Sequence, residues 1–331
     1  MNIIVNFLKK SWHPSKVLYT FLEHFSFAGA FSQKTVKYFW AHMKDAKLTS
    51  CFFISILLIL TLIVSSPGLA HGDFRIVIMQ DQKGMAEKYR PLLNFLKEKD
   101  FDTSFVAARN YPHAAELFVS GLADGMFSGS AIAGCMLIKQ LAYPVVRPVN
   151  IEGWSSYWAV VIGHEGSKRF TQSASYFDNK RIIFSSLASS GEFYFHSLDD
   201  SLQTHATLLK ACSHGAALDA LSRQAADFAI VKNRVWDKAR LKYPGLIRVG
   251  EDPGGNPDGT LIVSKKTDKT VVEKLRNVLL DLKEDQSSFA LSAKKRLEIK
   301  AFIPTSIADF KYTIQLLKKA GVDQNFNFNF E

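Results

Sequence analysis

Serine side chains cluster where a predicted strand meets a predicted helix. Residues 185–191 have the sequence SSLASSG, and Ser189, Ser190 and Gly191 lie where the helix should begin. Hydroxyl groups and free backbone N–H groups at a helix start favour an anion, because these donors converge and the helix dipole adds positive potential. Glu192 brings a negative charge into the same turn, so a serine-rich loop with a helix cap remains an alternative for this segment.

Two further groups of side chains are suited to holding an anion. Ser213 and His214 precede an alanine-rich helix, where Ser213 is a natural cap and His214 can donate a hydrogen bond to an oxyanion. Tyr111 follows one predicted strand and Tyr157 begins another, and tyrosines at a cleft can donate to an anion and shield it from water. Each of these side chains, taken alone, is also compatible with a structural role.

Catalysis is the less favoured interpretation of the same residues. Ser190 and His214 would be a nucleophile and its base, but the sequence contains no G-x-S-x-G turn and no motif that supplies a third member. The zinc motifs H-E-x-x-H and C-x-x-C are missing, as are the glycine-rich loops typical of nucleotide sites. We therefore expect a binding protein with no metal and no cofactor.

The elements that position these residues alternate between strands and helices. Short apolar runs predict strands, helical spacing of apolar residues predicts helices, and a Gly/Pro/Asp cluster at 251–259 predicts a loop. The predicted strands are 74–79, 103–107, 123–127, 157–163, 181–184, 226–231, 246–249 and 260–263, and the predicted helices include 85–97, 112–120, 270–282 and 307–319. Gly121 should end the second helix, and Asp268 lies near the start of the third. This alternation is typical of βαβ units in mostly parallel sheets.

Two such blocks joined by extended crossings predict an α/β fold with two lobes. Lobe 1 should contain residues 71–158 and 252–331, and lobe 2 should contain residues 159–251. The chain would leave lobe 1 near Tyr157 and return to it near Asp258. Because ligands of open α/β sheets bind at the carboxyl ends of the strands, we expect the ligand in a cleft between the lobes, with hinge closure around it.

An apolar segment at residues 51–66 precedes the predicted body. Lys44 and Lys47 lie before it and PGLA at 67–70 follows it, which is the layout of a secretory signal cut after Ala70. A membrane anchor needs about 20 apolar residues, so we favour cleavage, with an uncleaved anchor that tethers the body as the alternative. A leader of more than forty residues before the apolar segment is unusual, so we predict a start at Met43 or a poorly structured cytosolic tail at 1–42. A basic, aromatic segment that lies on a membrane is the alternative for these residues.

The net charge argues against a nucleic-acid partner. The chain has 41 basic and 31 acidic side chains, a net charge of +10. Residues 1–70 contain seven of the basic and two of the acidic side chains, so their removal leaves a net charge of +5. A nucleic-acid site requires a concentrated basic stripe instead. Cys135 and Cys212 remain in the body, and we expect two small buried side chains, because two cysteines make no disulfide framework.

Several segments become informative when they are taken in order. They are Asn110-Tyr111, AAELFVSGLADGMFSGSA, GWSSYWAVVI, ASSG, SHGAALDALSRQAADFAIV and NPDGTLIV, which lie between residues 74 and 317. This series resembles the periplasmic phosphate-, phosphite- and phosphonate-binding proteins of ABC importers, the PhnD-like family with the type II periplasmic-binding fold. The resemblance implies a periplasmic protein that captures a small phosphorus oxyanion by hinge closure and delivers it to an ABC permease. A periplasmic sensor that serves a membrane receptor or kinase is the alternative, and an exported hydrolase is a third.

The resemblance also implies roles for individual residues. The residues that match ligand contacts of the family are Tyr111, Tyr157, Ser189, Ser190, Gly191, Ser213, His214 and Asp258. The family turn is usually S-T-S-G, and the ASSG segment here lacks one hydroxyl. Arg234 stands near the place where aminoalkylphosphonate binders have an acid. We therefore predict that the ligand is not an aminoalkylphosphonate, and that Arg234 holds a further anionic group or a bare oxyanion, with a surface arginine as the alternative.

Overall fold

The computed structural model describes residues 73–79, 85–185 and 189–328. Asp73–Glu331 form one compact unit. Within the described ranges, no helix is both long enough and apolar enough to cross a membrane. The predicted apolar export segment, the start at Met43 and the cleavage site at Ala70 lie outside the described residues.

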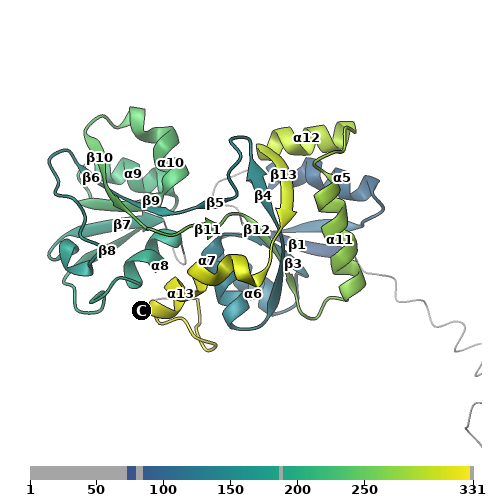
Figure 1. The fold of residues 1–331 in the computed structure, drawn as a ribbon, viewed down its shortest axis with the longest axis horizontal. Helices are drawn as coiled ribbons and strands as arrows, with labels where there is room; N and C mark the ends of the chain where they lie inside the picture. The colour runs from purple at the N-terminus through teal and green to yellow at the C-terminus, as the bar shows by residue number, and fades with distance from the viewer. Residues whose placement is uncertain (1–72, 80–84, 186–188, 329–331) are drawn as a thin grey trace, which may run out of the picture. The chain divides into compact units, whose positions relative to one another are not determined.

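Six strands form the first sheet, in the order β13-β4-β12-β3-β1-β2 (Figure 1). β1 is parallel to β2 and to β3, whereas β12 is antiparallel to β3 and β4, and β13 is antiparallel to β4. The strands are β1 (Phe74–Met79), β2 (Thr103–Ala108), β3 (Gly125–Ser128), β4 (Ala142–Asn150), β12 (Thr260–Ser264) and β13 (Ile299–Pro304). The helical elements of this half are η1 (Met85–Tyr89), α5 (Arg90–Glu98), α6 (Tyr111–Val119), α7 (Ser130–Ile138), α11 (Lys269–Asp281), α12 (Ser288–Leu297), η4 (Ile307–Phe310) and α13 (Lys311–Lys319).

Five strands form the second sheet, in the order β10-β6-β9-β7-β8. β7 is parallel to β8 and β9, and β6 is antiparallel to β9 and β10. The strands are β6 (Ala159–His164), β7 (Arg181–Ser185), β8 (Thr207–Ala211), β9 (Phe228–Lys232) and β10 (Leu246–Glu251). The helical elements here are η2 (Ala174–Phe177), α8 (Ser190–His196), α9 (His214–Ser222), α10 (Asn233–Ala239) and η3 (Arg240–Lys242).

Two short antiparallel strands connect the sheets, β5 (Ser156–Tyr157) on the way out and β11 (Asn256–Pro257) on the way back. The predicted strand 157–163 is therefore interrupted at Trp158. The backbone N–H of Trp158 donates to the side chain of Asn233 at 3.2 Å, and the backbone N–H of Asn233 donates to the Trp158 carbonyl at 3.0 Å. This pairing with α10 ends β5, and β6 then begins in the second sheet.

Both faces of the first sheet are buried. Ile76 and Val77 are neighbours on β1 and neither is exposed, because Ile76 packs with α5, α11 and α12 while Val77 packs with α6 and α7. Strands that are buried on both faces carry continuous apolar runs, and the segment at 74–79 has this pattern. The cluster around Val77 also includes Phe184 and Phe193 of the second half, so one apolar core links both sheets.

The predicted α/β class with helix-flanked sheets is confirmed. Both sheets are mixed, because β12 and β6 arrive from the opposite half and run antiparallel to their neighbours. Asp268 caps α11, and Gly121, with φ +78°, follows Ser120, the C-cap of α6. The predicted helix at 85–97 begins as a 3-10 turn, and its α-helical part starts at Arg90. The next residue, Pro91, has no backbone N–H, so it cannot donate the hydrogen bond that an α-helix extending further back would need. The described part of the chain contains two free cysteines. Cys135 is buried as expected, and Cys212 is exposed, because it lies in the turn between β8 and α9.

Several elements carry weak sequence signals and were not predicted. They are α7, α10, α12, β4, β8 and β13. Residues 130–137 are all buried, so α7 has no polar face and no helical period. β4 contains Pro144 and Pro148, residues that usually argue against a strand paired on both sides.

Candidate functional site

The predicted site residues lie where strands end and helices begin. β3 leads into α7, β7 into α8, β8 into α9, and β9 into α10. Carboxyl ends of parallel strands lie at one edge of a sheet, so each of these junctions brings backbone N–H groups and polar side chains to that edge. The crossing strands β5 and β11 add Tyr157 and the residues that precede Asp258.

Tyr157 connects the crossing to both halves of the chain. Its side chain is buried, and its hydroxyl lies 2.5 Å from Ser130 Oγ at the start of α7. The side chain of Ser190, at the start of α8, also hydrogen-bonds to Tyr157. Burial raises the pKa of Tyr157 to about 12, although these two hydrogen bonds act in the opposite direction. Tyr157 is therefore a neutral phenol at physiological pH and can donate its proton to an anion.

Asp258 holds two cations from the second half. Arg234 Nη1 lies 2.9 Å from Asp258 Oδ2, and Lys232 Nζ contacts Asp258 Oδ1. The Asp258 side chain is 16% exposed. Burial would raise its pKa, but the charges of Lys232 and Arg234 outweigh burial and hold the pKa below its ordinary value. Asp258 is therefore an ionised partner of Lys232 and Arg234.

Arg234 makes a second contact in the same cluster. Its Nη2 donates to the Ser156 carbonyl at 2.6 Å, which ties the start of α10 to the outgoing crossing. Its Nε is buried and has no hydrogen-bond partner among the described residues. The alternative of a surface arginine is wrong, since only 19% of the side chain is exposed.

His214 lies at the start of α9 and faces the end of β7. Its Nε2 is 3.4 Å from Ser185 Oγ, and its Nδ1 is buried without a partner among the described residues. Burial, with a smaller effect from the Lys232 charge, lowers the pKa of His214 to about 4, while Asp258 acts in the opposite direction. The imidazole is thus neutral at physiological pH. Among the serines that the structure describes, Ser185 and not Ser190 lies within hydrogen-bond distance of His214 Nε2.

The serines that precede α8 and α9 act as helix caps. Ser189 Oγ accepts from the Glu192 N–H at 3.3 Å, and Ser213 Oγ accepts from the Ala216 N–H at 3.1 Å. The prediction that Ser213 is a cap is confirmed. A hydroxyl that accepts from a helix still has its own proton to donate, so capping orients this proton away from the helix.

Gly191 has a packing role that follows from its missing side chain. A Cβ atom at this position would lie 2.5 Å from the Ile230 carbonyl oxygen on β9. The glycine therefore allows the first turn of α8 to approach β9 closely. The neighbouring Glu192 is buried and forms an ion pair with Lys210 at 3.4 Å.

Tyr111 approaches the same region from the first half of the chain. It begins α6, where Asn110 accepts from the His113 N–H at 2.9 Å as the helix cap. Its hydroxyl would lie 3.8 Å from a Cβ atom on Gly129. The Tyr111 hydroxyl is therefore beside the turn that carries Ser130.

The structure joins part of the predicted set through residues that were not predicted. Tyr157, Ser190, Arg234 and Asp258 are linked by Ser130 and Lys232, and His214 is linked to Ser185. Two signals in the sequence point to the missing residues. Residues 128–130, SGS, follow a predicted strand as the serine-rich turn does, and Lys232 directly follows another predicted strand, two residues before Arg234.

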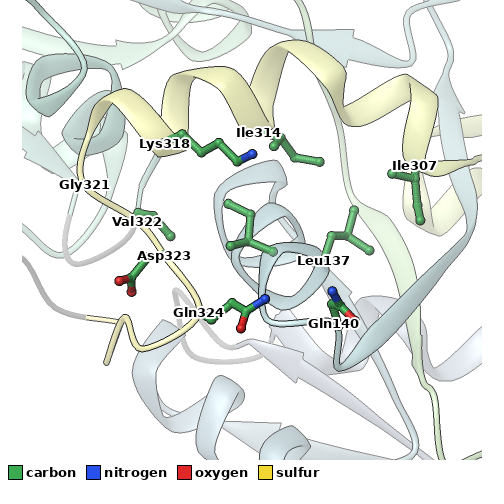
Figure 2. A pocket seen from close by; sticks show the side chains of 10 residues that line it. Leu137, Gln140, Ile307, Ile314, Lys318, Gly321, Val322, Asp323 and Gln324 are labelled. Atoms are coloured by element: carbon green, nitrogen blue, oxygen red, sulfur yellow. The ribbon is translucent and has the colours of Figure 1, made fainter.

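Two cavities lie elsewhere in the described part of the chain. One of about 660 Å³ lies between α7 and α13 and is lined by residues such as Leu137, Ile314 and Lys318 (Figure 2). One of about 320 Å³ lies beside α8 and α13, with Pro253 and Tyr312 in its wall. None of the predicted site residues lines either cavity.

Solved structures share this fold at low sequence identity. XAC2383 from Xanthomonas citri, bound to chloride ion, is 16% identical with a TM-score of 0.64, and the match covers 75% of this chain and 97% of that one. PhnD1 from Prochlorococcus marinus, in complex with methylphosphonate, is 15% identical with a TM-score of 0.61, covering 75% and 98%. PA3383 from Pseudomonas aeruginosa, a binding protein component of an ABC phosphonate transporter, is 15% identical with a TM-score of 0.57, covering 77% and 89%.

The family of the chain follows from its sequence. No curated protein matches it significantly. The family model for the ABC transporter, phosphonate, periplasmic substrate-binding protein matches residues 74–310, which include every predicted site residue. This is a family of substrate-binding proteins and not of enzymes. The chain belongs to the periplasmic substrate-binding proteins of phosphonate ABC transporters.

Proposed function

We propose that this protein captures a small phosphorus oxyanion (phosphate, phosphite or a phosphonate) in the periplasm and delivers it to an ABC permease. The single observation that carries the proposal is the cluster around Tyr157. Ser130 and Ser190, at two helix starts, contact Tyr157, and the Lys232 ammonium lies 4.2 Å from the centre of its ring. Lys232 and Arg234 share the Asp258 carboxylate, and the charges of Lys232 and Asp258 also act on the neutral His214 imidazole. An oxyanion suits this combination, because hydroxyl and imidazole donors can hold its oxygens in a site whose net charge is positive.

In this proposal, residues 71–158 and 252–331 form the first lobe, and residues 159–251 form the second lobe. Ligand contacts come from both lobes: Tyr111 and Tyr157 from the first lobe and its crossing, and Ser189, Ser190, Gly191, Ser213, His214 and Arg234 from the second. Asp258 stands on the return crossing and pairs with the cations of the second lobe. An oxyanion that bridges these groups would favour closure, because it contacts both lobes only when they approach each other.

The ligand should lack an amino group. Lys232 and Arg234 occupy the side of the cluster nearest Asp258, and that carboxylate already pairs with both. An alkylammonium group placed there would meet two positive charges and no free carboxylate. No observation favours the sensor alternative over import.

Calorimetric titration of phosphate, phosphite, methylphosphonate and 2-aminoethylphosphonate into the full chain tests the proposal. We expect binding of at least one of the first three compounds, and weaker binding of the aminoalkyl compound. Absence of binding for all four would refute the ligand class, and tightest binding of 2-aminoethylphosphonate would refute the predicted selectivity. N-terminal sequencing of the exported protein tests cleavage after Ala70, and a mature N-terminus upstream of Met43 would refute the predicted start.

A further inference from the structure

Lys232 lies at the centre of the cluster, although it is not among the site residues predicted from the sequence. It is the last residue of β9, and 24% of its side chain is exposed. Its Nζ contacts Asp258 and lies 4.2 Å from the centre of the Tyr157 ring. The ammonium group is thus held between a carboxylate and an aromatic face, beside the phenol that we propose as a ligand donor.

The charges of the cluster do not balance. Lys232 and Arg234 are cationic and Asp258 is their one acidic partner within the described residues. His214 and Tyr157 are both neutral at physiological pH, since their pKa values are about 4 and about 12. One positive charge therefore remains without a counter-ion in the described part of the cluster.

Donor groups also remain unused on the same side. Arg234 Nε is buried and has no partner among the described residues, and Asp258 is the only hydrogen-bond partner of Lys232 among them. A buried donor without an acceptor is destabilising, because it has lost its hydrogen bonds to water. A negatively charged acceptor would hydrogen-bond to these donors and neutralise the excess positive charge.

The neutral donors and the cations come from different elements. Ser130, Ser190 and His214 stand at the starts of α7, α8 and α9, whereas Lys232 and Arg234 flank the start of α10. Ser130 and Ser190 contact Tyr157, His214 contacts Ser185, and the two cations meet at Asp258. The cluster therefore has two parts, one suited to a single oxyanion and one suited to a second anionic group.

We propose that Lys232 and Arg234 bind a second anionic group of the ligand, so that the favoured ligand is a phosphonate with a carboxylate close to phosphorus. This inference rests on the proposed function, because the first anionic group is the phosphorus oxyanion itself. Lys232 is then the residue that sets specificity between carboxyalkyl, alkyl and aminoalkyl phosphonates.

Calorimetry with three probes tests the inference. Phosphonoacetate should bind the full chain at least tenfold more tightly than methylphosphonate, and 2-aminoethylphosphonate should bind most weakly. Lys232→Met should reduce the affinity ratio of phosphonoacetate to methylphosphonate about tenfold, because only the carboxylate loses its partner. Lys232→Arg should preserve most of the ratio, since it keeps the charge.

The matched control is Lys238→Met, which removes the same charge from an exposed position on α10 that pairs with Glu298 at 3.7 Å. It should leave both affinities unchanged. The ratio of the two affinities reports specificity even if a variant is less stable. The ranking of the three compounds is measured on the wild-type protein and depends on no variant. If methylphosphonate binds but phosphonoacetate does not bind more tightly, or Lys232→Met leaves the ratio unchanged, this inference is wrong and the proposed function stands. If no phosphorus compound binds, both are wrong.

Discussion

Asp258→Asn removes the carboxylate that holds Lys232 and Arg234, with almost no change in shape. The Arg234 pair at 2.9 Å corresponds to a Coulomb attraction of about 6 kcal/mol at an effective dielectric constant of about 20. Desolvation of the three side chains opposes this attraction. Loss of one partner from a buried pair costs about 3 to 5 kcal/mol. Because these side chains are 16% to 24% exposed, we expect the lower end, a loss of about 3 kcal/mol in the free energy of unfolding.

Urea denaturation at pH 7, followed by tryptophan fluorescence, measures this loss as a shift in midpoint at constant slope. Phosphate should raise the midpoint more in Asp258→Asn than in the wild type, because the anion replaces the missing counter-ion. The control is Glu273→Gln, which removes an exposed partner of Arg276 at 3.4 Å, and its effect should stay below about 0.5 kcal/mol. A loss below about 1 kcal/mol for Asp258→Asn would show that the pair behaves as a surface ion pair, and the charge argument for the site would fail.

Three further substitutions test individual parts of the site. Gly191→Ala should cost about 1 to 3 kcal/mol of stability, because the new Cβ would lie 2.5 Å from the Ile230 carbonyl oxygen. Gly215→Ala, whose Cβ would lie 3.9 Å from its nearest atom, should cost nothing, and equal urea midpoints for the two variants would contradict the packing role of Gly191. Tyr157→Phe should weaken oxyanion binding about tenfold or more in calorimetry, since a hydrogen bond to a charged group contributes about 1.5 to 3 kcal/mol, and an unchanged affinity would remove Tyr157 from the site. Burial lowers the pKa of His214 to about 4, so the unfolded chain binds a proton at this residue at higher pH than the folded chain, and the free energy of unfolding should fall as the pH drops from about 6.5 towards 4. His214→Gln should make the free energy of unfolding, measured by urea titration, depend less on pH, and a pH dependence equal to that of the wild type would be the contrary result.

Local signals predicted the elements whose apolar residues repeat clearly. β1 has a continuous apolar run and α11 has helical spacing with Asp268 as its cap, so both could be predicted without knowledge of the fold. β4 and α7 could not, because Pro144 and Pro148 interrupt the first and the second is apolar on all sides. Their identity depends on neighbours that are distant in sequence: β12 and β13 pair with β4, and α13 packs on α7.

The site shows the same division. Residue types and their positions predicted Tyr157 and His214 as candidate contacts, and the family resemblance added Arg234. The helix caps at Ser189 and Ser213 follow from local chemistry.

The partners of these residues depend on folding across the whole body. Ser130 meets Tyr157 across 27 positions of sequence, Lys232 meets Asp258 across 26, and Gly191 is required only because β9 lies against α8. The sequence by itself therefore determined the family, the class of fold and the kinds of donor in the site. Only the tertiary structure decided that Asp258 is a counter-ion and that Lys232 belongs to the site, because charge pairing and burial arise when distant strand ends meet.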